Sequence, residues 1–252
     1  MMKHKLPIFL DGPDKQTVGV SIIFSVLCFF SLPFLLLLFL QGLQNNIKVV
    51  SWFEIVFHVI AFSVTLGIFK DFVKDSWDEF VINRKEIFFF VKIGAAIALG
   101  IALVYYMAYV FYPCELTYLF GYGTLPIGEM NLFILPSEVA LVNPIVGTLC
   151  MTLVTPLTTA CLYYAVCFPN AHNVRPWLGY LVLAAGIALP RIANAVTYWI
   201  PYQQMILYFA QLPVHMVACW TYRRTNSIWA PTLVLAVANL GASLLMIFTY
   251  LL

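Results

Sequence analysis

The chain has 252 residues, of which 63% are hydrophobic, while 13 Lys and Arg and 11 Asp and Glu leave a net charge of +2. In a soluble domain about a quarter of the residues are charged. The composition therefore excludes a soluble globular domain and predicts an all-α integral membrane protein. The small positive balance gives no reason to expect a nucleic acid as partner.

Seven long apolar stretches alternate with gaps that hold most of the charges. Each has about 20 residues or more, the length at which an α-helix crosses about 30 Å of hydrocarbon. A helix also satisfies its own backbone hydrogen bonds in lipid, where water is absent. We therefore predict a polytopic transmembrane helical bundle of about seven spans, at Thr17–Gln41, Val50–Phe69, Ile87–Tyr112, Ala140–Phe168, Pro176–Ile200, Tyr202–Tyr222 and Ser227–Leu252.

The distribution of Lys and Arg predicts the orientation, because short loops rich in these residues stay in the cytoplasm. The gaps on one side of the predicted bundle hold only Lys48. The N-terminal segment and the gaps on the other side hold Lys3, Lys5, Lys15, Lys70, Lys74, Arg84, Lys85, Arg175, Arg223 and Arg224. We therefore expect a cytoplasmic N-terminus in a multi-pass protein of the cytoplasmic (cell) membrane, with membrane lipid as one partner.

The gap at residues 70–86 mixes both charge signs and has Val73, Trp77, Phe80 and Val81 at helical spacing. This pattern is typical of an amphipathic segment on the cytoplasmic face of a membrane. Two interpretations stay open. One is a charged connector whose side chains snorkel between two spans, and the other is a docking surface.

Ionisable side chains inside hydrocarbon are costly, which makes them candidates for function. Arg191 lies deep in its predicted span, next to Pro190, which removes a helical hydrogen bond. Asn194 follows about one turn later on nearly the same face, so the two side chains can share a polar pocket. Two roles stay open for Arg191: binding an anionic head group or carboxylate, and structural hydrogen bonding.

A second set of polar candidates consists of Glu54, His58 and His215. Glu54 and His58 are four residues apart and lie on one helical face as a potential hydrogen-bonded pair. Two ligands do not make a zinc site, and the six cysteines show neither a CxxC pair nor Cys/His ligand spacing. We therefore expect no metal and no cofactor.

Three segments in the C-terminal part resemble motifs of one family. The run CWTYRRTNSIWAPTLVLAVANL, Cys219 to Leu240, is similar to the closing motif of the CPBP (CAAX protease and bacteriocin-processing, or Abi) membrane proteins. TPLTTACLYYAV, Thr155 to Val166, resembles that family's P-x-x-E-E-x-x-x-R helix, and ALPRIANAV resembles its F-x-x-x-H helix. The resemblance implies a CPBP-like transmembrane core in residues 140–252, preceded by N-terminal spans and the amphipathic connector in residues 1–139.

In active members of that family, a glutamate pair, an Arg and two His form an intramembrane site that activates water to cleave peptides beside a lipidated or hydrophobic segment. Here the glutamates are replaced by Thr159 and Ala160, the Arg by Tyr164, and the two His by Asn194 and Leu235, while the family's Asn is kept as Asn239. These replacements supply no base with a pKa near neutrality. The resemblance therefore implies a protein that has lost the protease chemistry.

We expect such a pseudoenzyme to act by binding, as an accessory, immunity or scaffold partner of a membrane enzyme, a transporter, or a hydrophobic or lipidated peptide. Its pocket is predicted to contain Thr158, Thr159, Ala160, Tyr164, Arg191, Asn194, Leu235 and Asn239. Straight helices would spread Thr159, Asn194 and Asn239 over about 14 Å of depth.

Two other functions are alternatives to binding. The first is an enzyme with a rebuilt site, either a CAAX-type peptidase or an acyl or peptide transferase on lipidated substrates. It would use Arg191 with Glu54 and His58, or with His215. A small transporter is less favoured, because the spans show no obvious inverted repeat.

Overall fold

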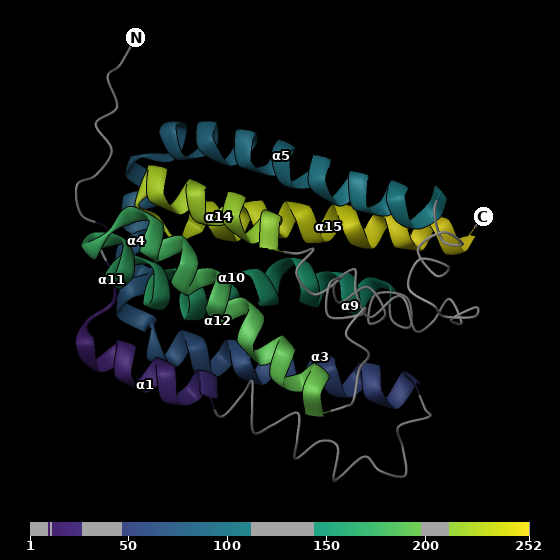
Figure 1. Cartoon of the computed structure of the whole chain (residues 1–252), viewed down its shortest axis with the longest axis horizontal. Helices are drawn as coiled ribbons and strands as arrows, with labels where there is room; N and C mark the ends of the chain where they lie inside the picture. Colours follow the sequence, from purple (N-terminus) through teal and green to yellow (C-terminus); the bar gives the residue numbers. More distant parts are fainter. Residues whose placement is uncertain (1–9, 11, 27–46, 112–143, 198–211, 252) are drawn as a thin grey trace.

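The computed structural model describes residues 10, 12–26, 47–111, 144–197 and 212–251, and Figure 1 shows their arrangement. Throughout these residues the backbone is helical apart from short turns, and they contain no strand. The prediction of an all-α fold is therefore confirmed for this part of the chain.

One composite helix carries the segment that resembles the P-x-x-E-E-x-x-x-R motif. It runs from residue 144 to 174 through α9 (Pro144–Leu149), η3 (Cys150–Val154), α10 (Thr155–Thr159), η4 (Ala160–Ala165) and α11 (Val166–Val174). Its segments η3 and η4 are π-helical, a wide geometry that is rare and frequent at functional sites. The other helices are α1 (Lys15–Val26), α3 (Ile47–Ile68), α4 (Lys70–Ile82), α5 (Arg84–Phe111), α12 (Pro176–Thr197), α14 (Leu212–Thr225) and α15 (Trp229–Leu251).

Two of the described helices are long and apolar enough to cross a membrane. They are Arg84–Val104 within α5 and Ile145–Val174 within the composite helix. A third span is present if the bent pair Ile55–Ile68 and Lys70–Ile82, which meet at 83°, counts as one. The length and composition of these helices indicate a membrane protein.

The count of seven spans stays a prediction. The predicted spans Thr17–Gln41 and Tyr202–Tyr222 lie partly outside the described residues, so their full length is not covered. The described apolar parts of α12 and α15, Pro176–Ala188 and Trp229–Leu245, are shorter than a full span.

Most of the long helices run roughly along the long axis of the molecule, whereas α4 meets the preceding helix at 83° (Figure 1). Helices α5, α14 and α15 pack against one another on one side, the composite helix contacts α3, α12 and α15, and α1 packs against α3. The α4–α5, α11–α12 and α14–α15 turns, at Asn83, Arg175 and Asn226, lie at the left end in Figure 1. We call this end the basic end, because Arg84, Lys85, Arg175, Arg223 and Arg224 adjoin these turns.

Hydrogen bonds tie separate parts of the chain together at the basic end. The Ile228 amide donates to the Ser76 hydroxyl at 3.3 Å, which joins α4 to the start of α15. The Leu10 amide donates to Oδ1 of Asn173 at 3.0 Å, and Nδ2 of Asn173 donates to the Leu10 carbonyl at 3.1 Å. The segment before α1 is therefore held against α11 by a two-way amide contact.

The composite helix ends later than the sequence predicts. The predicted span ends at Phe168, whereas α11 continues through Pro169 to Val174. Arg175 then adopts an extended conformation, with φ −149° and ψ 130°. The break falls there because a residue that precedes a proline, here Pro176, is driven out of the helical region.

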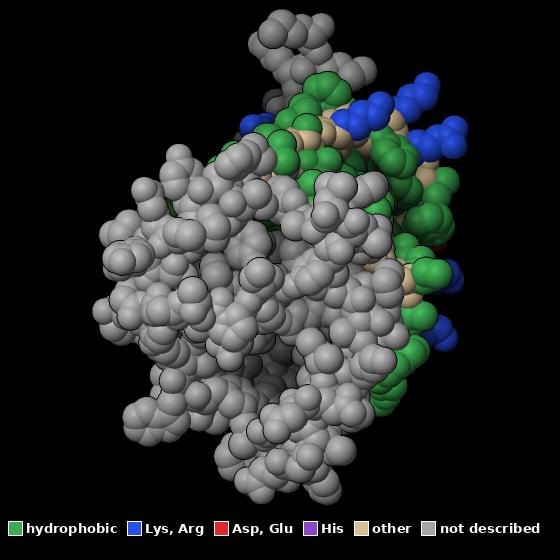
Figure 2. Space-filling model, turned by 90° about the vertical axis from the view of Figure 1, so that its right-hand side faces the viewer, with side chains coloured by type: hydrophobic (Ala, Val, Ile, Leu, Met, Phe, Trp, Pro, Cys, Tyr) green, Lys and Arg blue, Asp and Glu red, His purple; other side chains and the backbone are tan. Residues whose placement is uncertain are grey.

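The outward surfaces of the described helices are largely apolar. Ile145, Leu153 and Val104 are 76%, 63% and 69% exposed, a pattern that suits contact with acyl chains. In Figure 2, the described side chains on the face shown are mainly hydrophobic, and Lys and Arg side chains gather along one edge.

Gly94 sets the closest approach of α5 to its two partner helices. A Cβ added there would lie 2.5 Å from Cγ2 of Thr221 on α14 and 3.0 Å from Cγ2 of Val234 on α15. Both neighbours are β-branched and stiff, and the Thr221 hydroxyl is held by the Ala218 carbonyl at 2.6 Å. Without a hydrophobic driving force between helices in lipid, such small-residue contacts let backbones pack closely.

We expect Gly94→Ala to destabilise the fold by about 1–3 kcal/mol, the usual cost of overpacking a tight contact. Gly100→Ala on the same helix is the matched control, because a Cβ there meets nothing within 4 Å. The midpoint of thermal unfolding of the purified protein in detergent measures both changes. An equal midpoint for the two variants would contradict the packing described here.

Candidate functional site

Six of the eight residues of the predicted pocket lie on neighbouring helices. Thr158 and Thr159 end α10, Ala160 and Tyr164 lie in η4, and Leu235 and Asn239 lie one turn apart in α15. Helix α15 packs against α10, η3 and η4, so these segments adjoin one another. Ala160, Tyr164, Leu235 and Asn239 are all buried, with Ala160 and Tyr164 at 0% exposure.

A buried polar contact in this region joins Tyr164 to His215. The Tyr164 hydroxyl lies 2.7 Å from Nδ1 of His215, and the two residues are 51 positions apart in the chain. Their ring centroids are 6.2 Å apart, and His215 is only 9% exposed. A buried hydrogen bond therefore stands where the resemblance places a reactive Arg.

This contact bears on two expectations drawn from the sequence. The structure places His215 on α14 against Tyr164, a partner that the sequence does not indicate, while its combination with Arg191 stays a prediction. The degenerate pocket was also expected to contain no side chain that accepts a proton, and an imidazole now lies beside it. No motif signals the pairing, since the rotation of α14 about its own axis decides which neighbour His215 meets.

Threonine hydroxyls line the composite helix before η4. The Thr158 hydroxyl donates to the Val154 carbonyl at 3.1 Å, and the Thr155 hydroxyl lies 3.5 Å from the Cys150 carbonyl, five residues back across the π-helical turn. The hydroxyl oxygens of Thr148 and Thr152 are buried and have no hydrogen-bond partner. These two hydroxyls therefore lack the hydrogen bond that a buried polar group usually makes.

Three of the predicted candidates are not tested by the described side chains. Arg191 and Asn194 belong to α12, whose backbone stays helical through Pro190 to Thr197, but their side chains lie outside the described part. The Glu54 side chain also lies outside it, so its pairing with His58 stays a prediction. His58 is half-buried, with its ring centroid 5.6 Å from that of Phe57.

An aromatic cluster at the basic end was not singled out by the sequence. The centroid of the Phe168 ring lies 4.9 Å from that of His172, 5.1 Å from that of Tyr180 and 6.3 Å from that of Tyr222. Both ring nitrogens of His172 are buried without a hydrogen-bond partner. A Cβ at Gly179 would lie 2.8–2.9 Å from Phe168 and 2.9 Å from His172, so only glycine lets α12 pack this closely against α11.

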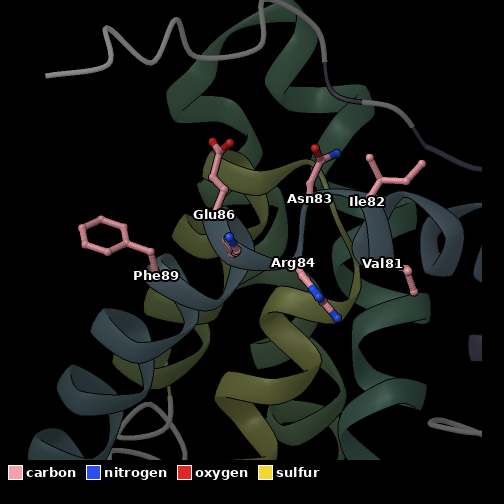
Figure 3. Close-up of a pocket in the computed structure, with 7 residues that line it drawn as sticks. Val81, Ile82, Asn83, Arg84, Glu86 and Phe89 are labelled. Carbon is pink, nitrogen blue, oxygen red and sulfur yellow. The ribbon is translucent and has the colours of Figure 1, made fainter.

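An open depression of about 890 Å³ lies at the turn between α4 and α5. It is lined by Val81, Ile82, Asn83, Arg84, Lys85, Glu86 and Phe89. Figure 3 shows these side chains fanning outward around the turn, with Glu86 and Arg84 pointing in different directions. The polar groups do not converge on a common point, which does not suit a small-molecule site.

No group of three or more His, Cys, Asp or Glu side chains that could hold a metal ion occurs within the described residues. Comparison of the chain with family models, with curated proteins and with solved structures finds no match. The resemblance to the CPBP proteins therefore rests on the quoted motifs.

The Tyr164–His215 hydrogen bond can be measured by a double-mutant cycle. We expect Tyr164→Phe to destabilise the fold by about 1 kcal/mol, a usual value for polar contacts in membrane proteins. In a His215→Leu background the same change should cost clearly less, because its partner is gone. Unfolding by SDS in mixed micelles gives the free energies, and strictly additive costs would show that the two side chains are not coupled.

Proposed function

We propose that this chain is a catalytically degenerate CPBP/Abi-type membrane protein that acts by binding. In this proposal it has about seven spans in the cytoplasmic membrane, with its N-terminus in the cytoplasm. It serves as an accessory, immunity or scaffold partner of a membrane enzyme, a transporter, or a hydrophobic or lipidated peptide. The gathering of Arg175, Arg223, Arg224 and the α4–α5 cations at one end supports this orientation.

The buried Tyr164–His215 contact is the observation that carries the proposal. Activating water requires a base that is open to water and to substrate. Here His215 is 9% exposed and bonded to a phenol, while Ala160, at a glutamate position, is 0% exposed. A buried hydrogen bond between two packed side chains suits a structural contact in a binding protein better than a hydrolytic centre.

The unpaired threonine hydroxyls support a peptide segment as the bound group. A buried hydroxyl without a partner costs about 1–3 kcal/mol, which a new hydrogen bond relieves. Thr148 and Thr152 lie in the composite helix, which is long and apolar enough to span a membrane. In this proposal, an apolar peptide with one free backbone amide or carbonyl packs against the composite helix and pairs with one of these hydroxyls after the side chains that cover it move aside.

A binding experiment with a cleavage readout tests the proposal. In nanodiscs, we expect a fluorescent farnesylated peptide to bind saturably and to remain intact. Thr152→Val, which removes an unpartnered hydroxyl at nearly constant shape, should weaken binding about five- to tenfold, the value of one hydrogen bond. Thr232→Val is the matched control, because the Thr232 hydroxyl already donates to the Ile228 carbonyl at 2.8 Å.

Two results would overturn the proposal. The first is metal-dependent cleavage of the peptide by the purified protein that disappears in Thr159→Ala. The second is a complete absence of binding by this peptide together with the absence of any membrane protein or peptide that copurifies in mild detergent.

The second candidate function is a membrane enzyme with a rebuilt site. The observation that favours it is the same pair, because His215 brings an imidazole next to a hydroxyl group near the position of the lost Arg. Hydroxyl and imidazole groups in contact are the elements of nucleophilic catalysis, as in acyl transfer. Lipidated peptides are the substrate class that the resemblance suggests.

For this second function we expect His215→Ala to lower acyl or peptide transfer to a lipidated acceptor at least about a hundredfold, the usual worth of a positioned base. Arg191→Ala and His58→Ala serve as parallel variants. Product formation is followed by mass spectrometry of the acceptor peptide. Equal activity of all three variants and the parent chain would exclude the rebuilt site.

A further inference from the structure

The surface of α4 divides into longitudinal stripes of different chemistry. Residues at i, i+4, i+7 and i+11 share one side of a helix. One such set, Phe69, Val73, Ser76 and Phe80, faces the protein, since Phe69, Ser76 and Phe80 are buried and Val73 is half-buried. This stripe fixes the rotation of α4 about its axis.

The next stripe around the helix is basic and apolar. It consists of Lys70, Lys74, Trp77 and Val81, which are all exposed, with Trp77 at 46% and Val81 at 49%. We call this set the Lys–Trp stripe. Asp71, Asp75 and Asp78 lie beyond it on the side away from the protein, and Glu79 lies on the opposite flank of the buried stripe.

Contacts at the basic end hold α4 in place. The ring centroid of Trp77 lies 4.9 Å from that of Trp229 and 5.3 Å from that of Phe80. The ring centroid of Phe80 lies 5.6 Å from that of Phe88 at the start of α5. Together with the bond between Ser76 and Ile228, these contacts join α4 to the starts of α5 and α15. The Lys–Trp stripe is therefore presented in a fixed direction.

Helix α4 runs nearly perpendicular to the helix that precedes it. It meets the preceding helix, Ile55–Ile68, at 83°, so when that helix crosses a membrane α4 runs close to the membrane plane. Its attachment to the α4–α5 and α14–α15 turns puts it at the basic end, at the level where spans leave the hydrocarbon. Trp and Lys are favoured at that level, because an indole ring suits the interface and a lysine stem reaches from the acyl region to a phosphate.

We propose that α4 is an in-plane interfacial helix whose Lys–Trp stripe binds anionic phospholipid of the adjoining leaflet. Carboxylates outnumber lysines on α4, so its net charge does not attract such a lipid. The charges on the stripe of Trp77 do, because both lysines lie on this stripe and the four carboxylates lie off it, with Asp71 and Asp78 one turn from Lys74. This proposal does not depend on the CPBP resemblance or on the bound peptide.

Fluorescence quenching in vesicles of purified protein tests the position of Trp77. The Trp77 signal is the difference between the parent chain and Trp77→Phe. We expect this signal to be quenched by lipids brominated near the head of the acyl chain, and more strongly by brominated phosphatidylglycerol than by brominated phosphatidylcholine. Quenching by aqueous iodide without quenching by either lipid would overturn the proposal.

A matched pair of neutralised variants tests the charge separation. Lys70→Gln/Lys74→Gln should lower the preference of Trp77 for phosphatidylglycerol by about fivefold or more, since each lysine near an anionic surface contributes about that factor. Asp71→Asn/Asp75→Asn, one position along the same helix, should leave the preference unchanged or raise it. An equal preference in both variants would show that the Lys–Trp stripe does not select the lipid. All four positions are exposed, so the fold tolerates either change.

Discussion

The close packing of α5 against α14 and α15 is the constraint on which the arrangement of the polar residues depends. In lipid, apolar side chains gain little by exchanging acyl chains for one another, so helices associate where small residues let their backbones approach. Gly94 provides that approach against Thr221 and Val234. Once Thr221 is fixed against α5, the rotation of α14 about its own axis is fixed as well. His215, on a different side of α14 from Thr221, is then directed toward Tyr164 of η4.

Sequence periodicity predicted the features that depend on local chemistry. The apolar stretches correctly indicated helices, and the pattern at residues 70–86 indicated an amphipathic segment that the structure shows as α4. Its two sides could not be told apart from sequence, because Trp77 and Phe80 are both apolar, yet one is exposed and the other buried. Phe80 contacts Phe88 on the next helix, and both Phe80 and Trp77 contact Trp229 on a segment distant in the sequence, so burial depends on packing that periodicity does not record.

The errors have equally specific causes. The fourth predicted span ends at Phe168, but the helix continues through Pro169, which lies one turn into α11, directly after the π-helical segment η4, where the regular pattern of helical hydrogen bonds is already interrupted. The missing amide of proline then removes little. The contact between Tyr164 and His215 escaped prediction because it depends on the relative rotation of two helices, which no residue type records.

Under the proposed function, the residues at the former catalytic positions give up hydrolysis and make the core more stable. A site with two carboxylates, a guanidinium and two imidazoles must hold several titratable groups in low dielectric, at a cost of several kcal/mol for each uncompensated charge. Thr159, Ala160 and Tyr164 remove that cost, and neighbouring hydroxyls such as that of Thr158 bond to their own helix. A core of this kind no longer needs a path for water. It can then serve as a rigid frame that holds the surface of the basic end, including α4, in a fixed position relative to the membrane.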